Sequence, residues 1–262
     1  MSLPIWTPDA LSSEILPVRG AFWRLVEAQH QVSTMKLVET SEEQALLETL
    51  LDETKPQLPP EARGLDYLLA TPFRYGAAYP HGSRFRRAGR TPGVFYAAAS
   101  VATAVAEMAF YRLLFFTESP ATALPANPAD YTAFAVSIAT ERGLDLTRPP
   151  LSRNREAFEH PTDYAACQAL AETARTASID AILYRSIRDP ARGMNIALLN
   201  ARGFAQREPT ERQSWRIHLS AGHVQALCDF PRHRLGFSLA DFAADPRLAA
   251  RFDISGSTPD RP

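Results

Sequence analysis

The amino-acid sequence predicts an α+β fold with a mixed, mainly antiparallel sheet and flanking helices. Two apolar runs, AILYRS at 181–186 and MNIALLN at 194–200, have the length of strands and are separated by only seven residues. A parallel pair needs a crossover of a dozen or more residues, so these two strands should be antiparallel. A third run, YTAFAVSIA at 131–139, alternates as a half-buried strand does.

Capping signals and helical patterns place the helices. Ser41 and Gln44 have the spacing of a capping box, which predicts a helix over 41–53. Ser100 is expected to cap a helix from 101 to about 115. The remaining elements are expected to be a helix at 163–176, strands at 21–26, 94–98 and 214–220, and loops at 71–93 and 118–130.

Length and composition indicate a soluble, cytoplasmic protein with one main domain. The 262 residues are 45% hydrophobic and 22% charged, enough to bury a core without a disulfide or a structural metal. We expect a lead-in over 1–18, the main domain over 19–230 and an extension over 231–262. The uncharged run 92–106 is shorter than the roughly 20 residues that a membrane span requires. No signal peptide is visible at the N-terminus.

The sequence lacks the motifs that several classes of function require. The sequence has no GxGxxG, no P-loop, no HExxH and no GxSxG, which argues against Rossmann redox chemistry, P-loop hydrolysis and zincins. Cys167 and Cys228 have no metal-site spacing, so we expect two buried thiols and no metal. The net charge of −1 gives no overall attraction for nucleic acid or membrane.

A stretch of forty residues, 67–106, contains no Asp or Glu. Its arginines lie in a glycine-rich segment with aromatic residues between them, and guanidinium groups bind phosphate bidentately and stack on rings. An anion site is one interpretation, and a solvated basic face is the other. The basic residues of the stretch are Arg74, Arg84, Arg86, Arg87, Arg90 and His81, and the aromatic ones include Tyr75, Tyr79 and Phe85.

Glu107 is the first carboxylate after this stretch. The helix around it is apolar on nearly every face, and its next carboxylate is Glu118. A helix of this kind is buried, and a buried carboxylate is costly unless it is paired or hydrogen-bonded. Glu107 is therefore expected either to pair with an upstream arginine or to face a developing positive charge, and one site could serve both roles.

Ser186 ends an apolar strand between two cations, Arg185 and Arg188. A hydroxyl in this position can orient a sugar or an amide, although serine is also a common turn residue.

These three elements, in this order, resemble the RES-domain family, which is named for its Arg, Glu and Ser. The block GSRFRRAGRTPGVFYAAASVATAVAEMAFYR resembles the family's central segment, with Tyr96 and Glu107 eleven residues apart. Arg24 in FWRLVE is similar to the family's first arginine, although Leu25 stands where a tyrosine is usual. The segment ILYRSIRDPARGMNIALLN supplies Ser186 and Asn195. The resemblance covers roughly residues 20–200.

The central arginine of the family pattern could be Arg84 or Arg86. Arg84 is favoured because an aromatic residue follows it, and Arg86 is the alternative.

The resemblance implies an ADP-ribosyltransferase-like fold and an enzyme that consumes NAD as a substrate, with no cofactor and no metal. Nicotinamide leaves as a neutral molecule, so one carboxylate can suffice where O-glycoside hydrolysis needs two. The catalytic residues implied are Glu107, Arg84 and Ser186, and the NAD-binding residues are Arg24, Arg84, Tyr96, Ser186 and Asn195. The family also implies a toxin with a cognate antitoxin as partner, and a homo-oligomer is compatible with the sequence.

Two rival functions remain at this point. ADP-ribose could be transferred to a macromolecule instead of to water or phosphate, since the first half-reaction is the same. A non-catalytic module could bind RNA or protein through residues 84–90, although the sequence pI of 6.6 does not indicate a wide basic face.

Overall fold

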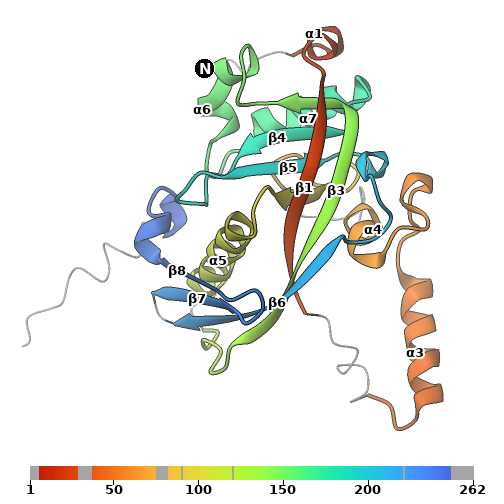
Figure 1. Cartoon of the computed structure of the whole chain (residues 1–262), viewed down its shortest axis with the longest axis vertical. Helices are drawn as coiled ribbons and strands as arrows, with labels where there is room; N and C mark the ends of the chain where they lie inside the picture. The colour runs from red at the N-terminus through yellow and green to blue at the C-terminus, as the bar shows by residue number, and fades with distance from the viewer. Residues whose placement is uncertain are drawn as a thin grey trace, which may run out of the picture.

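The computed structural model of the chain describes residues 6–28, 37–74, 82–89, 91–119, 121–220 and 222–248. Within these ranges the chain forms one eight-stranded sheet with helices around it (Figure 1). The strands are β1 Leu16–Glu27, β2 Phe95–Ala98, β3 Ala129–Asp145, β4 Ala181–Arg185, β5 Met194–Leu198, β6 Glu211–Ser220, β7 His223–Cys228 and β8 His233–Ser238. The helices are α1 Pro8–Ser12, α3 Ser41–Thr54, α4 Tyr67–Arg74, α5 Val101–Glu118, α6 Arg155–Phe158 and α7 Ala165–Thr176, with short 3₁₀ turns η1 Pro60–Ala62, η2 Leu151–Asn154, η3 Ala201–Gly203 and η4 Leu239–Phe242.

The strand order is β1-β2-β5-β4-β3-β6-β7-β8, and β1 also pairs with β3. The first five strands therefore form a closed ring, and β6 to β8 continue the sheet from β3 (Figure 1). The β3–β4 pair is parallel, and the other pairs are antiparallel, including β4–β5. The expected α+β fold with a mixed, mainly antiparallel sheet is confirmed.

One of the two predicted helix caps is confirmed and the other is wrong. Ser100 caps α5 as expected, because its side chain accepts a hydrogen bond from the backbone of Thr103 at 3.1 Å. At α3 the expected Ser41–Gln44 box is wrong by one residue. Thr40 Oγ1 accepts from the Glu43 backbone at 3.1 Å, and a Glu43 carboxylate oxygen accepts from the Thr40 backbone at 3.3 Å.

The loop expected over 71–93 begins later than predicted, since α4 continues to Arg74. Tyr75, Tyr79, His81 and Arg90, which belong to the acid-free stretch, lie outside the described residues.

α5 lies against the sheet and supplies buried residues to an apolar cluster of the core. Phe110 of α5 is fully buried, and its ring lies 5.8 Å from that of Phe242. The same cluster includes Trp215 of β6 and Leu248. Residues 233–248, within the expected C-terminal extension, thus supply both a strand and core side chains. In Figure 1 this segment, drawn in blue, lies beside α5.

Cys167 and Cys228 are free and buried, and burial raises the pKa of Cys167 to about 11. Within the described ranges no group of three potential metal ligands converges. None of the helices seen there is long and apolar enough to span a membrane.

Candidate active site

The loop between β4 and β5 is fixed against the start of α5. The Ser186 backbone donates to the Gly193 carbonyl at 2.8 Å, which closes the loop. Asp189 Oδ2 accepts from Thr103 Oγ1 at 2.8 Å and from the Gly193 backbone at 3.1 Å. A Cβ at position 193 would lie 2.2 Å from Thr103 Oγ1, so only glycine permits this approach. The loop therefore holds Ser186 at a set position relative to α5.

Glu107 receives two hydrogen bonds at one oxygen. Ser186 Oγ and Asn195 Nδ2 each donate to Glu107 Oε1 at 2.7 Å. No hydrogen bond to Oε2 and no ion pair to Glu107 occurs among the described residues. Two neutral donors therefore take the place of the ion pair that the sequence allowed. Glu107 itself is half-buried and lines a cavity.

Ser186 does not line the cavity, but it contacts Glu107, which does. Ser186 is fully buried. Its Oγ also accepts from the backbone N–H groups of Arg188 at 3.2 Å and Asp189 at 2.9 Å. A direct hydrogen bond from Ser186 to a ribose or an amide, as expected from the sequence, does not fit this arrangement. Ser186 instead donates a hydrogen bond to Glu107.

Asn195 carries an unused acceptor beside Glu107. The residue is 3% exposed and lines the cavity, and its Oδ1 is buried with no hydrogen-bond partner among the described residues. Buried polar atoms are rarely left without a partner. This oxygen is therefore suited to accept a hydrogen bond from a ligand hydroxyl or amide.

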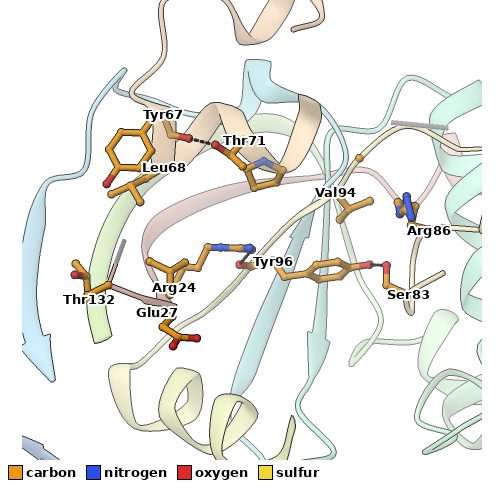
Figure 2. Close-up of a pocket in the computed structure, with 14 residues that line it drawn as sticks. Arg24, Glu27, Tyr67, Leu68, Thr71, Ser83, Arg86, Val94, Tyr96 and Thr132 are labelled. Atoms are coloured by element: carbon orange, nitrogen blue, oxygen red, sulfur yellow. Dashed lines mark hydrogen bonds between the residues drawn. The ribbon is translucent and has the colours of Figure 1, made fainter. Parts of the chain in front are cut away.

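Arg24 and Tyr96 are joined through the backbone. Arg24 Nη1 donates to the Tyr96 carbonyl at 3.0 Å, and its guanidinium lies 5.2 Å from the centre of the Phe95 ring. Burial lowers the pKa of Arg24 to about 10, so the group stays charged at neutral pH. The Tyr96 hydroxyl lies 2.8 Å from Ser83 Oγ and accepts from the Phe85 backbone at 3.0 Å. Figure 2 shows Arg24, Tyr96 and Ser83 in a row beside a second cavity, which these three residues help to line.

Arg84 is held by backbone carbonyls. Its Nη1 donates to the Phe158 carbonyl at 2.6 Å, and its Nη2 donates to the His160 carbonyl at 3.1 Å. The guanidinium also lies 4.7 Å from the centre of the Tyr164 ring. Arg84 is only 7% exposed, yet it contributes to the wall of the Glu107 cavity. Part of its hydrogen-bonding capacity is thus already used by the protein.

Two cavities meet at Arg24, Ser83 and Tyr96, which line both. The Glu107 cavity has a volume of about 520 Å³, and the second has about 560 Å³. Figure 2 shows that Arg86 belongs to the second cavity, on the opposite side from Tyr67. The two candidate arginines, Arg84 and Arg86, therefore belong to different cavities.

Several residues of the Glu107 cavity were not predicted from the sequence. Tyr111 follows Glu107 by one helical turn, a spacing that places both on one face. Arg188 follows Ser186 by two residues, and its position beside that serine was the only signal. Other polar cavity residues that were missed include Ser83, Tyr164, Tyr184 and Arg247.

Comparison with protein families identifies the class of protein. The model of the RES domain matches residues 58–220, which is more than half of the chain and includes Glu107, Ser186 and Asn195. The chain belongs to the RES-domain family. It is also similar to a chain in the crystal structure of the MbcT–MbcA toxin–antitoxin complex of M. tuberculosis, at 14% identity and a TM-score of 0.47, covering 83% of this chain and 94% of that one. No curated protein matches the chain.

Proposed function

We propose that the protein is an enzyme that cleaves the bond between nicotinamide and ribose in NAD. NAD is then a substrate that is consumed, and no further cofactor is needed. The observation that carries this proposal is Glu107, held at one oxygen by two neutral donors while its side chain lines a cavity rich in tyrosine. A carboxylate beside an open cavity suits a reaction in which a cation develops.

The reaction breaks one bond at the ribose and forms another. The bond between C1′ of the ribose and the pyridinium nitrogen breaks, and its electron pair leaves with nicotinamide, which becomes neutral. The ribosyl carbon gains positive charge in the transition state, and Glu107 stabilises it. Water, phosphate or a nucleophile on a macromolecule then forms the new bond at C1′ and releases a proton. No general acid is needed for the leaving group.

The two adjoining cavities suit the two halves of a dinucleotide. The rings of Tyr111, Tyr164 and Tyr184 in the Glu107 cavity provide stacking surfaces for a pyridinium. Arg24 stands where the cavities meet and carries a charge available to the pyrophosphate that links the two halves. Asn195 Oδ1 would accept a hydrogen bond from the ribose or the carboxamide.

Purified protein incubated with NAD is expected to release free nicotinamide, which chromatography can quantify. Parallel reactions with and without inorganic phosphate separate hydrolysis from phosphorolysis, and a labelled acceptor protein detects ADP-ribosyl transfer. Absence of nicotinamide release by folded protein under all three conditions would contradict the proposed function.

We further propose that the protein acts as the toxin of a toxin–antitoxin pair in the cytoplasm. Its expression alone is expected to lower cellular NAD and to arrest growth, and co-expression of a cognate antitoxin should restore both. The matched control is Glu107→Gln, which should accumulate to the same level without lowering NAD. Normal NAD and normal growth despite abundant soluble wild-type protein would argue against this role.

A further inference from the structure

Arg188 lines the Glu107 cavity and has a donor that no described residue uses. The residue is 5% exposed, and its guanidinium lies 4.4 Å from the centre of the Phe110 ring. Its Nη2 donates to the Pro161 carbonyl at 2.9 Å and to the Tyr164 hydroxyl at 2.8 Å. Its Nε is buried and has no hydrogen-bond partner among the described residues. A buried N–H of a cation without an acceptor is costly, so it is suited to an anionic ligand.

Arg247 brings a second cation to the same cavity from the C-terminal segment. Its guanidinium lies 5.5 Å from the centre of the Phe110 ring, which Arg188 also contacts. Arg247 forms two hydrogen bonds to the carboxylate of Asp245, at 2.9 and 2.8 Å. Packing of Phe242 and Leu248 in the core fixes this segment against α5.

Asp245 lies close to both arginines but accepts hydrogen bonds only from Arg247. Its Oδ2 lies 3.6 Å from Arg188 Nη2, which is too long for a hydrogen bond. Burial alone would raise the pKa of Asp245, but the hydrogen bonds from Arg247 lower it below its ordinary value. The cluster therefore holds two guanidinium groups and one carboxylate, and an excess positive charge faces the cavity.

We propose that Arg188 and Arg247 form a subsite for a phosphoryl group, with Asp245 as its counter-charge in the free protein. The phosphoryl group would belong either to the bound dinucleotide or to a free phosphate that acts as acceptor. The inference rests on the proposed function for its substrate, and it adds the C-terminal segment to the site. Two guanidinium groups around one site match the geometry and charge of phosphate oxygens.

Two substitutions should change phosphoryl binding in opposite directions. Arg247→Gln removes one cation and should weaken binding about tenfold, whereas Asp245→Asn removes the competing anion and should tighten it about three- to tenfold. Asparagine retains an acceptor for Arg247, so the segment should stay folded. Titration calorimetry with inorganic phosphate and, separately, with ADP-ribose measures both effects.

Matched controls come from an exposed ion pair that lines neither cavity. Arg216 of β6 forms an ion pair with Asp229, which follows β7. Arg216→Gln and Asp229→Asn therefore change the net charge as Arg247→Gln and Asp245→Asn do. These two variants should leave both affinities within twofold of the wild type. Thermal melting of all four variants checks that each is folded.

The outcomes separate the sources of the phosphoryl group. Opposite shifts with ADP-ribose assign the subsite to the dinucleotide, and opposite shifts with inorganic phosphate alone assign it to an acceptor. Shifts in the same direction, or no shift with either probe in folded variants, would overturn the subsite. Because neither probe is turned over, a protein that binds in this way but releases no nicotinamide would contradict the catalytic proposal and leave the subsite intact.

Discussion

Replacement of Arg84 by lysine is expected to destabilise the protein by about 3 kcal/mol, since hydrogen bonds from a charged donor contribute about 1.5–3 kcal/mol each. The substitution removes the donors that reach the Phe158 and His160 carbonyls, and lysine's single ammonium cannot reproduce a planar fork. Arg84 is buried, so water cannot readily replace what is lost. Urea denaturation of the two proteins measures the difference.

Arg142 provides a matched control for this effect. Its guanidinium also donates to two backbone carbonyls, those of Ser178 and Ala177, both at 2.7 Å, but the residue is exposed. Arg142→Lys should therefore cost less than about 1 kcal/mol, because solvent can hydrate the freed carbonyls. If Arg84→Lys costs no more than this control and instead raises the KM for NAD, the main role of Arg84 is to bind substrate.

The elements that were predicted correctly are those with local signals. The short spacing between β4 and β5 determines that they are antiparallel, and Ser100 caps α5 through contacts within one turn. The parallel β3–β4 pair joins segments that lie far apart in the sequence, so no local pattern predicts it. β8 lies within the expected C-terminal extension, and its pairing with β7 across only four residues was not predicted. The capping box at α3 was misplaced because Thr40 and Ser41 are both good capping residues, and only the backbone geometry distinguishes them.

At the site, too, the sequence motifs predicted some residues, whereas other features depend on how distant segments pack. The resemblance named Glu107, Ser186 and Asn195, and the fold brings all three within hydrogen-bonding distance. The sequence could not indicate that Ser186 would be fully buried, because the burial comes from the loop closed by Gly193. Arg247 had no signal at all, since its place in the cavity depends on how the C-terminal segment packs against α5.

Replacement of Glu107 by glutamine is expected to lower kcat by about 10² or more, as when other preorganised groups that stabilise a transition state are removed. Glutamine keeps the size of the side chain, and its carbonyl oxygen can still accept from Ser186 and Asn195. Only the charge is lost. Binding of NAD should change little, because the positive charge on the ribose develops only in the transition state.

The alternative is that Glu107 serves only to hold the β4–β5 loop against α5 through Ser186 and Asn195. Glutamine would then preserve most of this function, and turnover per folded molecule would survive. Single-turnover release of nicotinamide and thermal melting, measured on the same sample, distinguish the two roles. Ser186→Ala is the informative companion, because it removes one donor but leaves the carboxylate charged. If the charge is what matters, Ser186→Ala should reduce kcat less than Glu107→Gln does. A folded Glu107→Gln protein with near wild-type turnover would refute the mechanism, whatever the behaviour of Ser186→Ala.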